Sequence, residues 1–160
     1  MTLASRNTAE GFAERTLRNL KFIQEASEGG QMEVHPITQL TNSFLGLMLF
    51  PWTELVDEKT RSLKMVELYK QGWPEIAIEL DDSSEIDSGT LHGVIGHLRN
   101  SICHQRFQFS SENTNPDFVK ITFEDARGKN ARVNWRATIM AADLKAFCTK
   151  FIELVRGVVG

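Results

Sequence analysis

The chain has 160 residues, of which 41 % are apolar and 24 % are charged, and this is an ordinary composition for a globular protein. That length is enough to bury about 70 % of the unfolded surface, so we expect a single domain over residues 1–160. The net charge of −3 excludes nucleic-acid binding through overall charge, and any such binding must come from a local basic patch.

Two long helices are expected in the first third of the chain. The first runs from about Thr8 to Glu28, and Gly29-Gly30 end it because glycine adopts the left-handed conformation without steric cost. The second runs roughly from Pro36 to Phe50 and is stopped by Pro51. The apolar run from Phe44 to Trp52 is too short to cross a bilayer, so no membrane contact is expected.

A charged segment follows, from Thr53 to Lys70. It predicts one helix or two short ones, with Leu55, Leu63 and Val66 facing inward and Leu68 offset from them.

The next segment, from Glu75 to Asp87, is acidic and contains no basic residue. Alternating apolar residues at its start indicate a short strand around Ile76 to Leu80. The Asp81-Asp82 pair could be interpreted as a metal site, but the segment has neither a glycine-turned calcium loop nor paired histidines. The simpler interpretation is a mobile acidic loop in front of the next helix.

The central stretch, from Ser88 to Phe107, predicts an amphipathic helix. A stripe of apolar residues at helical spacing should be buried, and the opposite side carries polar and glycine residues. A glycine costs a helix interior about 1 kcal/mol relative to alanine. Gly93 and Gly96 therefore suggest that a second helix or a ligand approaches this helix closely.

A β-hairpin is expected after the central helix, with strands at residues 118–123 and 131–136 joined by a turn at residues 127–130. The hairpin is the most basic local segment, and we predict that it binds RNA through Arg127, Lys129, Arg132 and Arg136. Trp135 could stack on nucleic-acid bases or pack on the helices, and the sequence leaves both open. A last helix, about Ala141 to Val158, completes an up-and-down helical bundle that is mainly α.

Within the central helix, Arg99-Asn100-Ser101-Ile102-Cys103-His104 has the pattern R-N-x-x-x-H. This pattern resembles the R-x4-6-H signature of the HEPN superfamily, a group of all-α domains that includes metal-independent ribonucleases. The likeness extends diffusely over the whole chain and is greatest to small bacterial, often plasmid-borne, HEPN-family nuclease-like proteins.

The resemblance implies a HEPN-type endoribonuclease, acting as a toxin or in phage defence, that cleaves RNA by 2′-OH transesterification without a cofactor. The residue types suit this chemistry, because histidine titrates near neutral pH and arginine binds phosphate with two parallel hydrogen bonds. We therefore predict that Arg99, Asn100 and His104 are catalytic, with Asn100 orienting His104 or binding the phosphate. On an ideal helix Arg99 lies about 140° from His104, which is a difficulty for this interpretation.

Partners and alternatives follow from the same resemblance. One histidine does not easily serve as both acid and base, and the family solves this by dimerisation, so we expect a homodimer with two motifs in one cleft. The alternative is a non-catalytic HEPN-type dimer that binds nucleotide, RNA or a partner protein such as an antitoxin. His97 and His104 could share a metal, but no carboxylate stands at a matching position, so no metal is expected.

The expected location is the cytoplasm. Two cysteines are too few for a disulfide framework, and the beginning of the sequence lacks the apolar core of a signal peptide.

Overall fold

The computed structural model describes residues 3–30, 35–49, 54–82, 86–111, 113, 115–128 and 131–159. The helices in this part of the chain are α1 (Leu3–Glu28), α2 (Pro36–Leu49), α3 (Glu54–Ser62), α4 (Met65–Lys70), α5 (Leu91–Cys103) and α6 (Ala141–Val159), with a short 3-10 turn at Pro116–Phe118. The strands are β1 (Ala77–Asp81), β2 (Phe107–Phe109), β3 (Lys120–Asp125) and β4 (Trp135–Met140).

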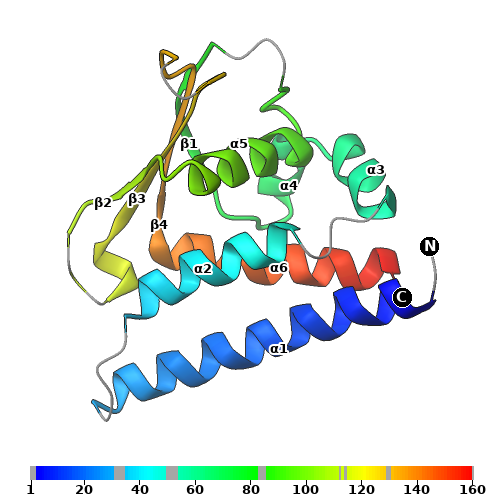
Figure 1. The fold of residues 1–160 in the computed structure, drawn as a ribbon, viewed down its shortest axis with the longest axis vertical. Coiled ribbons are helices and arrows are strands. Elements are labelled where there is room, and N and C mark those ends of the chain that lie inside the picture. Colours follow the sequence, from blue (N-terminus) through cyan, green and yellow to red (C-terminus); the bar gives the residue numbers. More distant parts are fainter. Residues whose placement is uncertain are drawn as a thin grey trace.

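The long helices α1, α2 and α6 lie side by side along one side of the molecule (Figure 1). The predicted end of the first helix and the predicted start of the second are confirmed, since Gly30, with φ of 62°, follows α1 and Pro36 begins α2. The predicted start of the first helix is wrong, because α1 begins at Leu3 and not near Thr8. Phe44 of α2 is fully buried against Phe147 of α6, with ring centroids 6.0 Å apart. These helices therefore form the predicted bundle and enclose its apolar core.

The charged segment forms two short helices, as one of the two interpretations predicted, and Leu63 packs against the core as predicted. The inward face of the second of these helices, α4, was predicted wrongly. Val66 is 58 % exposed, whereas Leu68 is 3 % exposed. The reason is a break between α3 and α4, where Lys64 forms an isolated antiparallel bridge with Thr90 and interrupts the helical phase. The side chain of Leu55 lies outside the described residues.

The predicted hairpin is present as β3 and β4, but its strands lie two to four residues later than expected. Asp125 pairs with Trp135, so residues 131–134, of which Arg132 is one, belong to the connecting loop. The expected turn residues lie inside this longer loop, which is why the spacing of the turn gave the wrong strand ends.

The hairpin is the middle of a four-stranded antiparallel sheet in the order β1-β4-β3-β2. The short strand predicted around Ile76 to Leu80 is confirmed as β1, which pairs with β4. The mainly helical fold class is thus compatible with the structure, but a hairpin alone understates the β-structure. The added strands come from distant parts of the sequence, since Ala77 pairs with Thr138 and Phe107 with Phe123.

Helix α5 packs against β3 and lies between the sheet and α3 (Figure 1). Its apolar stripe is buried as predicted, with Leu91, Ile95 and Leu98 at most 1 % exposed. The helix is shorter than the predicted stretch, because it ends at Cys103 and Phe107 already belongs to β2. Both termini lie at one end of the molecule, at the far end of α6 from the sheet. No helix in the described part of the chain is long and apolar enough to span a membrane.

Candidate functional site

Helix α5 carries the candidate motif, and its first turn is fixed by Thr90. The Thr90 side chain accepts a hydrogen bond from the backbone N–H of Gly93 at 3.1 Å, which caps the helix. The same hydroxyl donates to the carbonyl of Asp87 at 2.8 Å. The carboxylate of Asp87 accepts from the backbone N–H of Gly89 at 2.9 Å, and this bond, followed by that from Lys64, holds its pKa below the usual value. The start of α5 is therefore tied to the acidic segment before it.

The segment from Asp87 to Thr90, which caps α5, explains why one of the two glycines, Gly93, is required. A Cβ atom placed on Gly93 would lie 2.0 Å from the carbonyl oxygen of Asp87, so only glycine fits there. At Gly96 the nearest atom to such a Cβ is Cγ2 of Ile86, at 3.8 Å, which is ordinary contact. Gly93 is thus occupied by the protein's own chain, and the prediction that it leaves room for a second helix or a ligand is wrong.

The last turn of α5 determines where His104 lies. Gln105 adopts a left-handed conformation with φ of 56°, and its N–H donates to the carbonyl of Ile102 at 3.0 Å. The N–H of Arg106 donates to the carbonyl of Ser101 at 2.7 Å. These two bonds form a Schellman motif and make His104 the C-cap of the helix. The imidazole is exposed there.

The three motif side chains leave α5 in different directions. Arg99 is half-buried and lies near enough to His92 to lower the pKa of that histidine, although burial is the larger cause. Asn100 turns toward the sheet. Neither the guanidinium of Arg99 nor the imidazole of His104 has a hydrogen-bond or ion-pair partner among the residues that the structure describes. Both are therefore uncommitted, but they do not meet within the described chain.

Asn100 is held by Asp125, a residue that we did not select from the sequence. Oδ2 of Asp125 accepts from Nδ2 of Asn100 at 3.1 Å and lies 2.8 Å from Nδ1 of His97. Oδ1 accepts from the backbone N–H of Ala126 at 2.8 Å. Burial raises the pKa of this carboxyl, but the hydrogen bonds from His97, Asn100 and Ala126 outweigh it and hold the pKa below its usual value.

His97 and Trp135 form the inner wall of this cluster. The side chain of His97 is 1 % exposed and stacks on the indole of Trp135, with centroids 4.6 Å apart and planes inclined by 7°. Trp135 itself is fully buried. The packing interpretation of Trp135 is therefore correct, and its ring is not available to stack on a base from outside.

The residues of the hairpin that were predicted to bind RNA differ in whether their side chains are exposed or already paired. Arg132 is exposed in the loop before β4. Arg136 is paired with Glu124, whose Oε1 lies 2.8 Å from Nε and 2.6 Å from Nη2 of the arginine. Arg127 is exposed in the same loop, and Lys129 lies outside the described residues. The structure thus leaves Arg132 more accessible to a phosphate than Arg136.

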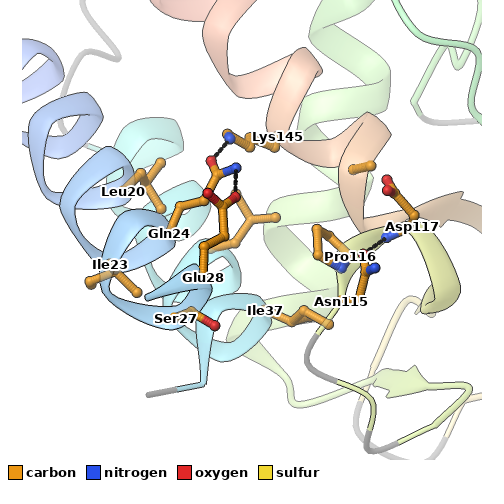
Figure 2. A pocket seen from close by; sticks show the side chains of 12 residues that line it. Leu20, Ile23, Gln24, Ser27, Glu28, Ile37, Asn115, Pro116, Asp117 and Lys145 are labelled. Carbon is orange, nitrogen blue, oxygen red and sulfur yellow. Dashed lines mark hydrogen bonds between the residues drawn. The ribbon is translucent and has the colours of Figure 1, made fainter. Parts of the chain in front are cut away.

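The structure also contains a pocket away from the motif residues. It has a volume of about 550 Å³ and lies where the end of α1, the beginnings of α2 and α6 and the 3-10 turn meet (Figure 2). In Figure 2 its rim contains Gln24, which bonds both Glu28 and Lys145, and Asp117, whose N–H donates to Asn115. The apolar residues that line it include Leu20, Ile23 and Ile37. None of the motif residues lines it.

In the described part of the chain, no three histidine, cysteine or acidic side chains come together in a way that would hold an ion. Asp81 ends β1, where the strand pairs with β4.

Asp125 could have been recognised from strand periodicity. In β3 the buried positions alternate as Ile121, Phe123 and Asp125, so the period that turns two apolar residues inward also turns a carboxylate inward. A buried acid without a partner would be unstable, so this position predicts a polar partner on the helix above it.

A family model described as HEPN pEK499 p136 matches residues 1–157. No curated protein and no solved structure matches the chain.

Proposed function

Since the chain belongs to the HEPN pEK499 p136 family, we propose that it is a metal-independent endoribonuclease of the HEPN type. The observation that carries this proposal is the state of two side chains, that of Arg99 on α5 and that of His104 at the C-cap of α5. Neither side chain has a hydrogen-bond or ion-pair partner among the described residues. Side chains that serve only the fold are usually satisfied by partners, whereas groups that act on a substrate stay available to it.

The reaction is a transesterification within RNA. The 2′-oxygen bonds to phosphorus while the bond from phosphorus to the 5′-oxygen breaks, which leaves a 2′,3′-cyclic phosphate and a 5′-hydroxyl. One imidazole takes the proton of the 2′-hydroxyl, and a second imidazole, already protonated, gives a proton to the leaving 5′-oxygen. The guanidinium of Arg99 stabilises the negative charge of the crowded phosphorus.

A homodimer supplies the second imidazole. One chain contributes one motif, and in that chain Arg99 and His104 leave α5 on different sides. A two-fold symmetric pair would bring the His104 of each copy to a single cleft, together with an Arg99 from either copy. The available motif residues support this arrangement, and with Gly93 filled by Asp87 the helices would meet elsewhere along α5.

A non-catalytic HEPN-type dimer that binds nucleotide, RNA or a partner protein is the second candidate. It is favoured by one observation, namely that Arg99 and His104 do not contact each other within the described chain. For the enzyme we propose a cellular role as a toxin, with or without an antitoxin, or as a phage-defence nuclease. Growth arrest on expression would separate the enzyme from the non-catalytic dimer.

We expect RNA cleavage to continue in EDTA and to leave a 2′,3′-cyclic phosphate. The chemistry assigned to His104 and Arg99 needs proton transfer and cationic hydrogen-bond donors rather than a metal-bound water. The measurement is the cleavage of a mixed RNA substrate with and without EDTA, with the product ends identified by mass spectrometry. Cleavage that stops in EDTA and returns with Mg²⁺ or Mn²⁺, or that leaves a 5′-phosphate, would contradict the proposal.

The loop between β3 and β4 is expected to bind RNA through Arg132. Replacing Arg132 with glutamine should weaken binding and reduce the salt dependence of the association constant by about one phosphate contact. Arg136→Gln should have a smaller effect, because Arg136 is already paired with Glu124. Binding to a fluorescent RNA over a range of salt concentrations measures both changes.

Arg18→Gln is a suitable control, since Arg18 is exposed on α1, across the α2 and α6 layer from α5. If Arg132→Gln binds RNA with the same affinity and salt dependence as this control, the loop between β3 and β4 does not bind RNA. The basic residues that contact the phosphates must then lie elsewhere.

A further inference from the structure

Asp125 is the most constrained charged group near the motif. It lies at the end of β3 and is 5 % exposed, yet its carboxylate bonds to two side chains of α5 and to a backbone N–H. A buried carboxylate that forms three such bonds remains ionised, because hydrogen bonds to the charged form offset the loss of water.

An ionised carboxylate only accepts hydrogen bonds, and this fixes the orientation of both of its α5 partners. His97 must carry its proton on Nδ1, which lies 2.8 Å from Oδ2 of Asp125. Asn100 must direct its Nδ2 group to the same oxygen, at 3.1 Å. The carbonyl oxygen of the Asn100 amide is therefore the end that points away from Asp125.

Contacts with the core restrict the side chains of His97 and Asp125, which hold Asn100. His97 is clamped between Asp125 and the ring of Trp135, which is fully buried. The carboxylate also accepts from the backbone N–H of Ala126, the residue that follows β3. Asn100 thus has one stable orientation of its amide rather than two.

Asn100 is also the nearest motif residue to His104 along the helix. The backbone N–H of His104 donates to the carbonyl of Asn100 at 3.0 Å, so the two residues are one turn apart. Side chains at this spacing are neighbours on a helix surface. No hydrogen bond joins the two side chains in this structure, so the amide oxygen of Asn100 would accept the imidazole N–H of His104 once RNA is bound, which would set the tautomer and leave the other nitrogen to exchange protons with RNA.

We propose that Asp125 is a positioning residue for RNA cleavage, which acts through Asn100 to orient His104 and which is itself held in place by His97. The proposal rests on the function proposed above. Asp125 lies outside the R-N-x-x-x-H pattern, and it would connect the sheet to the reacting groups on α5.

The test is Asp125→Asn, which keeps the size of the side chain and removes its charge. We expect the cleavage rate at saturating RNA to fall roughly 10- to 100-fold, which is part of what an acid–base group contributes, with little change in KM. Asn100→Ala should lower the rate similarly. In the double variant Asp125→Asn should have almost no further effect, because both substitutions break the same connection.

A matched control separates positioning from stability. Thr122→Val removes the hydrogen bond between the hydroxyls of Thr122 and Thr138, 3.1 Å apart, on the other face of β3. It should lower stability while leaving cleavage unchanged. If Asp125→Asn cleaves like this control at equal stability, or if its effect multiplies with that of Asn100→Ala, Asp125 serves only the fold and the proposal is overturned.

A measurement without RNA tests the geometry directly, and it applies even if Asp125→Asn does not fold. In the unmodified protein the Nδ2 protons of Asn100 should exchange slowly with water, as observed by NMR. Fast exchange of both protons would overturn the proposal whatever the activity. An unmodified protein that cleaves no RNA overturns the proposed function and this role with it, whereas a cleaving protein with an active Asp125→Asn variant overturns this role alone.

Discussion

Replacing His104 with alanine is expected to lower the rate of RNA cleavage by about two to four orders of magnitude, the contribution of a positioned acid or base. The side chain is exposed at the C-cap of α5 and has no hydrogen-bond or ion-pair partner among the described residues, so its loss should leave the fold unchanged. Binding of RNA should remain, because the phosphate contacts proposed for the loop are untouched. Cleavage of labelled RNA and its binding, measured with the same variant, check both statements.

The control for this substitution is His35→Ala. His35 is exposed at the start of α2, and the hydrogen bond that it accepts from the N–H of Gln39 goes to its backbone carbonyl, so alanine retains it. In cells, growth arrest caused by the protein should disappear with His104→Ala and persist with His35→Ala. Full cleavage by the His104 variant would remove this histidine from the mechanism and favour the non-catalytic dimer.

The role of Arg99 can be tested with the same measurements of RNA cleavage and binding. Arg99→Lys keeps a positive charge but loses the planar fork that binds two phosphate oxygens together. Because the Arg99 side chain is half-buried and has no hydrogen-bond or ion-pair partner in the described chain, the change should act on the reaction rather than on the fold.

Gly93→Ala is expected to lower the stability of the protein, because an alanine side chain does not fit at this position of α5. The new Cβ would lie 2.0 Å from the carbonyl oxygen of Asp87 and 2.5 Å from its carbon. That carbonyl cannot move away easily, since it accepts bonds from the N–H and the hydroxyl of Thr90 at 3.0 Å and 2.8 Å. Overpacking of this kind costs about 1–3 kcal/mol or more, even though alanine favours a helix.

Gly96→Ala is the matched control on the same helix. Its Cβ would meet only Cγ2 of Ile86, at 3.8 Å, so the gain in helix propensity should stabilise the protein by up to about 1 kcal/mol. Chemical denaturation of the two variants measures both free energies of unfolding. If Gly93→Ala proves as stable as Gly96→Ala, Asp87 does not pack against α5 in the way described.

The sequence alone located the helices well, because their ends depend on nearby residues. Gly29-Gly30 and Pro36 determine the boundary between α1 and α2 through backbone conformations that glycine and proline impose locally. The apolar stripe of α5 likewise follows from spacing within a few turns. The R-N-x-x-x-H pattern is also local, and the family that it resembles is confirmed over residues 1–157.

Only the tertiary structure could show the features that depend on contacts between residues far apart in the sequence. Pairing of Ala77 with Thr138 extends the hairpin into a sheet, and no local pattern encodes which strands meet. The same sheet buries Trp135, which the sequence left open between packing and base stacking.

The same difference between local signals and long-range contacts applies to the candidate site. Its residue types and their order along α5 could be identified in the sequence, but their partners could not. Gly93 was expected to face another helix and instead meets Asp87, because the capping segment folds back over α5. Asp125 meets Asn100 across 25 residues of sequence only because β3 packs under α5. Local chemistry therefore determined which residues the protein places on α5, and tertiary packing determined which of them are held and which stay available.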